Sequence, residues 1–175
     1  SSAASDVYKR QLFGMPEAVF ADIATLRTGG KVDDYFIIHL MKPARMPEVK
    51  ITLKASYLMC ENEPRFVLHG TEGSYVKYGL DPQEADLTKG MLPDTPHWGE
   101  EDESQWGILH TETDGNVVRK PYPTLPGNYA AFYENIYQHI RNGAVLQSDA
   151  CGVLGVIRLI EAAWESSRTG NVIKL

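Results

Sequence analysis

A series of short apolar segments with a two-residue period, most of them bounded by turn signals, most constrains how this chain can fold. The clearest segment is 49–59, where apolar and polar residues alternate. The apolar set is Val49, Ile51, Leu53, Ala55, Tyr57 and Met59, and the polar set is Lys50, Thr52, Lys54 and Ser56. Because successive side chains of a strand point to opposite faces, the apolar set predicts a face buried in a core. The polar set predicts a face that meets solvent, a partner subunit or another domain.

The same period predicts further strands at 18–25, 34–41, 65–69, 74–78, 107–112 and 116–119, and a short last one at 172–175. The segment 34–41 (DYFIIHLM) is apolar almost throughout, which predicts a central strand covered on both faces. Gly29-Gly30 indicates a turn, and Asp114-Gly115 is the strongest hairpin signal in the chain. These strands predict an antiparallel meander.

Two helices are predicted after the strands. Apolar residues recur at helical spacing from Tyr129 to Ile140, ahead of Asn142-Gly143, and again from Val153 to Trp164, ahead of Gly170. Strands in hairpins followed by helices predict the α+β class, with a largely antiparallel open sheet and the helices packed on one face. The length of 175 residues suits one domain of ordinary size.

Two segments lie outside this pattern. Residues 81–105 carry prolines, glycines and the acidic run 100–103, which predicts a long surface loop. Residues 1–11 (SSAASDVYKRQ) have neither a helical nor a strand period, and we expect a foreign or disordered leader there.

Composition excludes several classes of protein. Seventeen Lys and Arg against 23 Asp and Glu give a net charge of −6, which disfavours nucleic acid and anionic membranes as partners. No segment reaches the roughly 18 apolar residues of a membrane helix. The two cysteines, Cys60 and Cys151, form no CxxC motif, so we expect a reducing compartment and a cytoplasmic protein.

The common catalytic and metal-binding motifs are missing from the sequence. The five histidines do not stand at metal-ligand spacing with partnering ligands, and we expect no metal site. There is neither a GxSxG elbow nor a GxGxxG phosphate loop. Two adjacent carboxylate pairs, Asp33-Asp34 and Glu100-Glu101, have the groups for acid and base catalysis, but such pairs more often mark turns or solvated loops.

The segment GSYVKYGLDPQE gathers the groups best suited to a polyhydroxylated ligand, namely Tyr75, Lys77, Tyr78, Asp81 and Gln83. Each hydroxyl of a sugar or cyclitol both donates and accepts, so amides, carboxylates, Lys and aromatic faces hold such ligands. Asn128 and Tyr129, at a predicted helix start, have further groups for the same cleft. The alternative interpretations are an amphipathic edge strand for the first group and helix capping for the second.

Four stretches carry a family resemblance: FGMPEAVFADIATLRTGGKVDDYF, HGTEGSYVKYGLDPQEADL, PGNYAAFYENIYQHIRNG and the closing ESSRTGNVIKL. They resemble the C-terminal domain of the Gfo/Idh/MocA oxidoreductases, and most closely the branch of scyllo-inositol dehydrogenases that use NADP. The resemblance runs over residues 12–175, and it implies that this range is a substrate-binding and oligomerisation domain.

The resemblance implies a larger enzyme, in which a Rossmann domain outside this chain binds NADP or NAD. That enzyme would oxidise a secondary alcohol of a sugar or cyclitol. The Lys, Asp and His of the family's hydride-transfer site match no residue here, so we assign no catalytic or cofactor-binding residue, and we expect the chain alone to be inactive and to bind no cofactor. The resemblance further implies that substrate-binding positions are Tyr75, Lys77, Tyr78, Asp81, Gln83, Asn128 and Tyr129.

A second hypothesis stays open beside the first. An amphipathic sheet with Lys50, Thr52, Lys54 and Ser56 on one face also suits a stand-alone, non-catalytic binding or assembly module. In both hypotheses we expect a homo-oligomer that forms through the sheet face. The two differ in the ligand, since the dehydrogenase hypothesis requires a small polyol or sugar substrate.

Overall fold

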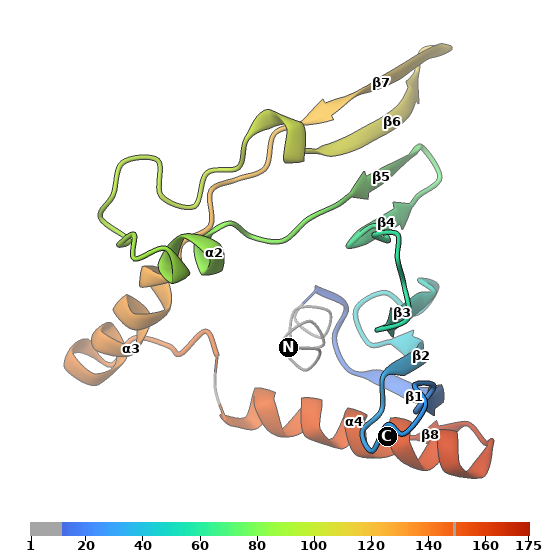
Figure 1. The fold of residues 1–175 in the computed structure, drawn as a ribbon. Coiled ribbons are helices and arrows are strands. Elements are labelled where there is room, and N and C mark those ends of the chain that lie inside the picture. The colour runs from blue at the N-terminus through green and yellow to red at the C-terminus, as the bar shows by residue number, and fades with distance from the viewer. Residues whose placement is uncertain (1–11, 149) are drawn as a thin grey trace. The chain divides into compact units, whose positions relative to one another are not determined.

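The computed structural model describes residues 12–148 and 150–175, so the leader predicted at 1–11 lies outside the described residues (Figure 1). Contacts divide the chain into two compact units. The first joins the residues up to Cys60 with Gln147–Leu175, and the second is Glu61–Leu146. The last helix and strand return to the first strands, so a chain whose length suits one domain contains one unit inserted within the other.

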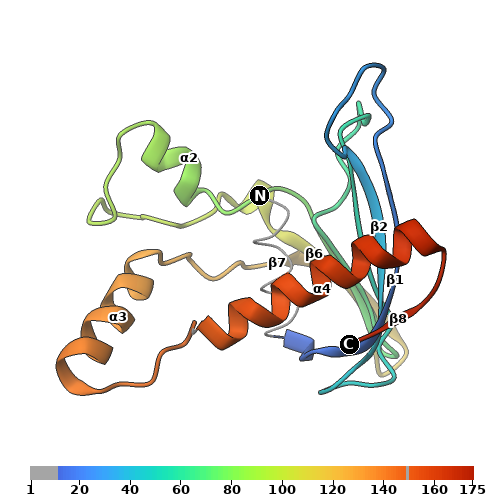
Figure 2. The ribbon, with the colours of Figure 1, turned by 90° about the horizontal axis from the view of Figure 1, so that it is seen from below.

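The first unit is a four-stranded antiparallel sheet covered by one long helix. The strand order is β3 (Ile51–Ser56), β2 (Tyr35–Pro43), β1 (Pro16–Ala24) and β8 (Ile173–Lys174). The helix α4 (Ala150–Thr169) lies across this sheet (Figure 2). The core consists of the inward residues of the strands and one stripe of the helix: Val19, Ala21, Ile38, Leu40, Ile51, Leu53, Leu159, Ala162 and Ala163. The alternation in 49–59 therefore predicted Ile51 and Leu53 of β3 correctly, but it is wrong for Tyr57 and Met59, which lie beyond the end of the strand and are exposed.

The expectation that the strand at 34–41 is covered on both faces is wrong for this chain. β2 is central, with β1 and β3 on either side. Ile38 and Leu40 are buried, whereas His39 and Met41 on the opposite face are exposed. The physical reason is that α4 packs on one face of this sheet, and no described element of the unit covers the other.

Two serines of α4 close the edge of β1 beyond the short β8. Ser166 Oγ accepts from the Ala21 N–H at 3.0 Å and donates to the Asn171 carbonyl at 2.6 Å. Ser167 Oγ accepts from the Ile23 N–H at 2.8 Å. β8 pairs with Ala18 and Val19, so the serine hydroxyls replace the strand partner that the rest of β1 lacks on this side.

The second unit holds another four-stranded antiparallel sheet, in the order β4 (Phe66–His69), β5 (Gly73–Lys77), β6 (Gly107–Thr113) and β7 (Asn116–Tyr122). Asp114 and Gly115 both have positive φ, 53° and 76°, as the predicted two-residue hairpin requires. The α+β class is confirmed, but the strands form two four-stranded sheets where one open sheet was expected.

The second unit also contains three helices, of which two lie in the predicted loop 81–105. These are α2 (Gln83–Thr88) and the 3₁₀ turn η1 (Glu103–Gln105). The third, α3 (Ala130–Asn142), ends at Gly143 in the left-handed conformation, as predicted. However, none of its residues is buried, so its apolar stripe is not part of a core in this chain.

Candidate functional site

A buried glutamine organises the polar groups that follow β5. Gln83 is fully buried in the first turn of α2. Its Nε2 donates to both carboxylate oxygens of Asp81, at 3.0 Å each. Its Oε1 accepts from Trp98 Nε1 at 2.9 Å and from the Tyr129 backbone N–H at 2.8 Å. Protein groups therefore engage both ends of the Gln83 amide, and three separate segments are tied together.

Two glycines let these segments approach each other closely. The Gly127 N–H donates to the Gly99 carbonyl at 3.0 Å, and Gly99 has a φ of +73°. A Cβ on Gly99 would overlap the Gly127 carbonyl, and a Cβ on Gly127 would overlap the Gln83 amide and the Asp81 carboxylate. The loop after α2 thus meets the segment before α3 at a distance that favours glycine at both positions.

A buried ion pair fixes the far end of the same loop. Lys77 Nζ, at the end of β5, lies 2.6 Å from Glu101 Oε2 and donates to the Gln105 carbonyl at 2.9 Å. The Lys77 side chain is 11% exposed and that of Glu101 is 6% exposed. The attraction between the charges and the added hydrogen bond offset the cost of taking both from water. Of the carboxylate pair at 100–101, Glu101 thus neutralises Lys77, and Glu100 bonds with His97 at 2.9 Å.

The structure brings together part of the predicted polyol cluster. Hydrogen bonds join Asp81, Gln83 and the backbone of Tyr129 in one network. Lys77 is engaged by Glu101 and the Gln105 carbonyl. The side chains of Lys77 and Gln83 are both buried, so these two residues hold the loop in place.

The other predicted positions lie at the ends of elements or on a strand. Tyr78 follows β5 and is half-exposed. The ring of Tyr75 lies over Gly107 of β6, where a Cβ would overlap it. Asn128 Oδ1 accepts from the Ala131 N–H at 3.1 Å, a bond of the kind that the capping alternative expects beside the first turn of α3.

A groove beside α3 contains functional candidates that the sequence interpretation missed. Its cavity has a volume of about 490 Å³ and is lined by Leu87, Pro93, Tyr129, Ala130, Tyr133, Glu134 and Tyr137. We call it the α2–α3 groove. The helical spacing of apolar residues from Tyr129 to Ile140 predicts only an apolar stripe, which includes Tyr133. The spacing of Tyr129, Tyr133 and Tyr137, four residues apart, was the signal that could have identified one lined face.

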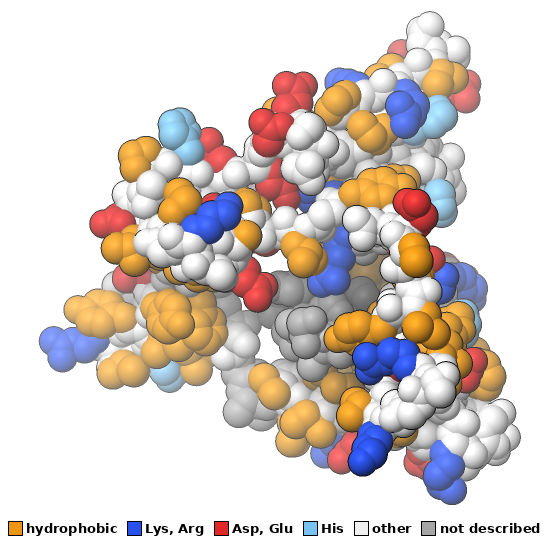
Figure 3. Space-filling view, in the orientation of Figure 1, with side chains coloured by type: hydrophobic (Ala, Val, Ile, Leu, Met, Phe, Trp, Pro, Cys, Tyr) orange, Lys and Arg blue, Asp and Glu red, His pale blue; other side chains and the backbone are white. Residues whose placement is uncertain are grey.

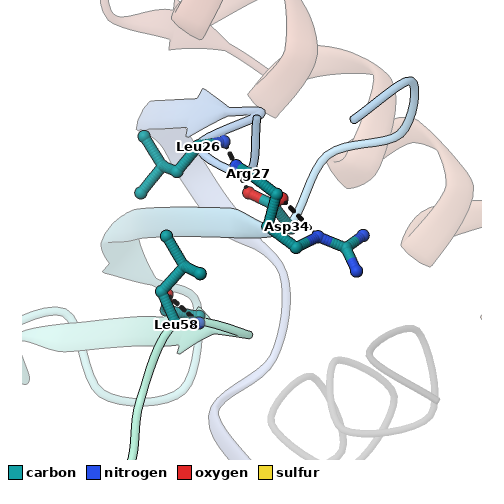
Figure 4. A network of polar contacts seen from close by, with 5 residues as sticks. Leu26, Arg27, Asp34 and Leu58 are labelled. Atoms are coloured by element: carbon teal, nitrogen blue, oxygen red, sulfur yellow. Dashed lines mark hydrogen bonds and ion pairs between the residues drawn. The ribbon is translucent and has the colours of Figure 1, made fainter. Parts of the chain in front are cut away.

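Asp34, a candidate acid or base, is a structural residue of the β1–β2 connection (Figure 4). Its carboxylate accepts from the Leu26 N–H at 2.6 Å, from the Arg27 N–H at 3.1 Å and from Arg27 Nε at 2.8 Å. These bonds, chiefly the one from Leu26, hold the pKa of Asp34 below its usual range. The residue is buried, and its bonds hold the turn at Gly29-Gly30 in place.

Four of the histidines, counting His97, bond with nearby polar groups through their side chains. His39 bonds with Thr52 at 3.1 Å, His69 with Ser74 at 2.8 Å, and His139 with the Ala144 carbonyl at 2.6 Å. Within residues 12–148 and 150–175, no group of three His, Cys, Asp or Glu could hold a metal ion. In the same residues, no helix has the length and apolar character needed to cross a membrane.

Comparisons with known proteins place the chain in a family. Residues 8–175 match the model of the Gfo/Idh/MocA oxidoreductases, described as the oxidoreductase family, C-terminal alpha/beta domain. A scyllo-inositol 2-dehydrogenase (NADP(+)) of Bacillus subtilis is 35% identical over 164 residues, which cover 94% of this chain and 45% of the relative. The uncharacterised oxidoreductase YdgJ of Escherichia coli is 34% identical, over 90% of this chain and 44% of its own length.

Solved structures agree with this assignment. The crystal structure of an oxidoreductase from Bacteroides fragilis superposes with a TM-score of 0.94 at 58% identity, over 99% of this chain and 51% of that one. The chain therefore spans about half the length of the relatives that it matches. The family match, the identities and the superposition show that this chain belongs to the Gfo/Idh/MocA oxidoreductases, as their C-terminal alpha/beta domain.

Proposed function

We propose that this chain is the substrate-side part of an NAD(P)-dependent oxidoreductase that acts on a secondary alcohol of a sugar or cyclitol in the cytoplasm. The observation that carries the proposal is the family match over residues 8–175, together with a relative named as a scyllo-inositol dehydrogenase. The exposed free thiol of Cys60 suits a reducing compartment.

The residues of this chain do not fit a dinucleotide. The sequence contains no GxGxxG, and the connection from β5 to α2 carries Asp81, whose carboxylate would repel a pyrophosphate. We therefore propose that NADP or NAD is held outside these 175 residues. The chain contributes binding and orientation of the polyol, and its side chains carry out no chemical step.

Within the site we propose two roles for the predicted residues. Tyr78 and Tyr129 contact the polyol, because both are partly exposed and carry hydroxyls that donate and accept. The remaining predicted positions hold the loop, the strand and the helix that carry them, as their contacts support: Tyr75, Lys77, Asp81, Gln83 and Asn128.

We also propose that the uncovered face of the first unit's sheet forms a homo-oligomer. Phe20 and His39 stack on this face with ring centroids 6.4 Å apart, and Met41 lies beside them, 39% exposed. Apolar residues on a sheet face favour self-association. Sedimentation equilibrium tests this: Phe20→Glu should shift the mass to the monomer, and an unchanged oligomer would contradict the assignment of this face.

The test of the proposed activity uses both the whole reading frame and this chain. The whole protein should reduce NADP or NAD when supplied with scyllo-inositol, myo-inositol or glucose, followed by absorbance of the reduced cofactor. The 175-residue chain alone should show no turnover above the protein-free rate. A whole protein inactive on every polyol, or turnover by the chain alone, would refute the proposal.

A further inference from the structure

We propose that the α2–α3 groove binds one ring of a neutral polyol, a cyclitol or a pyranose, with the Tyr133 ring as its platform. This inference rests on the proposed function and specifies where within this chain the polyol is held. Of the substrate-binding positions predicted from the sequence, Tyr129 alone lines the groove.

The aromatic lining is a row of three tyrosines on one side of α3. Tyr129, Tyr133 and Tyr137 stand four residues apart, so they rise by about 6 Å at each step and share a helix face. Each ring has an apolar face for the C–H groups of a sugar ring and a hydroxyl that both donates and accepts. Leu87 and Pro93 form the facing wall. This combination suits a molecule that is apolar on its ring faces and polar at its rim.

The polar lining favours a neutral ligand. The Glu134 carboxylate accepts from Gln138 Nε2 at 2.7 Å, which orients it on the groove side of α3. Among the seven lining residues there is no Lys, Arg or His, so an anionic sugar phosphate would meet a carboxylate without a cation. Phenols and a carboxylate can accept from several hydroxyls while the phenols donate to others.

The size and exposure of the groove also support a ligand. Its volume of about 490 Å³ lies within the roughly 300–1,000 Å³ typical of small-molecule sites. Hydrophobic side chains gather over α3 in the space-filling view (Figure 3), and Tyr133 is 70% exposed. Exposed apolar patches commonly mark sites where a ligand or another protein binds.

Buried contacts hold one end of the groove in a fixed geometry. The Tyr129 N–H is bonded to the fully buried Gln83, which is also bonded to Asp81 and Trp98. α2 and the start of α3 are therefore joined before any ligand arrives. A preformed wall lowers the entropy cost of binding.

Isothermal titration calorimetry of the 175-residue chain with myo-inositol tests the inference. Tyr133→Ala should weaken binding about 2- to 10-fold through loss of ring stacking, and Glu134→Gln should weaken it to a smaller extent. Ile140→Ala is the matched control, since Ile140 is an exposed residue of α3 that does not line the groove. It should leave the affinity unchanged, and circular dichroism should show equal helix content in all variants.

The results that would contradict the proposal can be told apart. Binding that weakens with Tyr78→Ala but not with Tyr133→Ala overturns the groove and leaves the proposed function standing. Tighter binding of tetramethylammonium or myo-inositol phosphate than of myo-inositol overturns the neutral-polyol assignment. A shift from dimer to monomer with Tyr133→Ala would make the groove an interface between copies. A fourth outcome combines two measurements. If calorimetry detects no binding of myo-inositol, and Tyr133→Ala leaves the KM of the whole protein unchanged, the groove proposal is overturned and the proposed function still stands.

Discussion

Replacing Gln83 by glutamate tests whether the buried amide holds the second unit together. The substitution keeps the shape of the side chain and the oxygen that accepts from Trp98 and Tyr129. It replaces the Nε2 group, which donates to both oxygens of Asp81 at 3.0 Å, with an oxygen. Two carboxylates then face each other across a hydrogen-bond distance, which they tolerate only if they share a proton.

The free energy needed to keep that proton bound sets the expected loss of stability in Gln83→Glu. A carboxyl with an ordinary pKa of about 4.3 pays about 1.4 kcal/mol for each pH unit above that value to remain protonated in the folded state. The upper bound on the electrostatic loss is therefore about 3.7 kcal/mol at pH 7 and about 1 kcal/mol at pH 5. Because Asp81 is exposed and water screens the pair, we expect a loss of about 2–3.7 kcal/mol at pH 7.

The direction in which the stability of Gln83→Glu changes with pH follows from the raised pKa of the carboxyl pair. The shared proton raises the folded-state pKa of the pair above its unfolded value, so the protonated pair is stable at low pH and that stability is lost as pH rises through the folded pKa. Urea unfolding followed by tryptophan fluorescence, at pH 5 and pH 7, measures the difference between variant and parent. Trp98 reports on this cluster directly, because its Nε1 donates to Gln83.

Two further variants make the test specific. Gln105→Glu is the control, since the Gln105 side chain is exposed, and its stability should stay within about 0.5 kcal/mol of the parent. Adding Asp81→Asn to Gln83→Glu restores a donor opposite a carboxylate and should recover most of the loss at pH 7. An equal loss at both pH values, or no recovery in the double variant, would refute the reasoning.

Three other perturbations have definite expectations. Ser166→Ala leaves the Ala21 N–H without its partner and should cost about 1–3 kcal/mol in urea unfolding, with exposed Thr28→Ala as the control; a loss below 0.5 kcal/mol would contradict the edge-closing role. Asp34→Asn should destabilise the chain at neutral pH. Since the pKa of Asp34 is lowered on folding, the difference in stability between variant and parent should become smaller as pH falls below about 4. A difference in melting temperature that does not change with pH would contradict this. Gly127→Ala should lower the melting temperature, because the added Cβ would overlap the Gln83 amide. Gly90→Ala is the comparison: its Cβ would meet no neighbouring atom, so it reports only the cost of a positive φ. Equal melting temperatures for the two variants would argue against the close approach at Gly127.

Local patterns predicted the strands well, because the signal for a half-buried strand lies within the strand itself. The alternation of Ile51 and Leu53 with Thr52 and Lys54 reports burial directly, and Asp114-Gly115 encodes its own turn. The short helix α2 was missed in a segment rich in proline and glycine. The signal was present in Pro82 at its start and in the acidic residues of its first turn, Glu84 and Asp86.

The candidate site was harder to predict because its contacts are not local. Gln83 was selected as a ligand-binding residue, but its partners Trp98 and Tyr129 lie 15 and 46 positions away. Sequence spacing cannot show that these segments meet. For α3, helical spacing predicted the helix and an apolar stripe on it, but spacing does not show what covers such a stripe, and Tyr133 is exposed.

The serine bonds between α4 and β1 also constrain the order in which the chain can fold during its synthesis. Ser166 and Ala21 are separated by 145 positions, so β1 leaves the ribosome long before the residues that complete its edge. At about 5–20 residues per second, this delay lasts roughly 7–30 seconds. The second unit, Glu61–Leu146, has its strand pairings within itself, so it is complete while the first unit still waits. During that interval β1 exposes an unpaired edge, and it is then that the nascent chain is most open to wrong strand pairing or to capture by a chaperone.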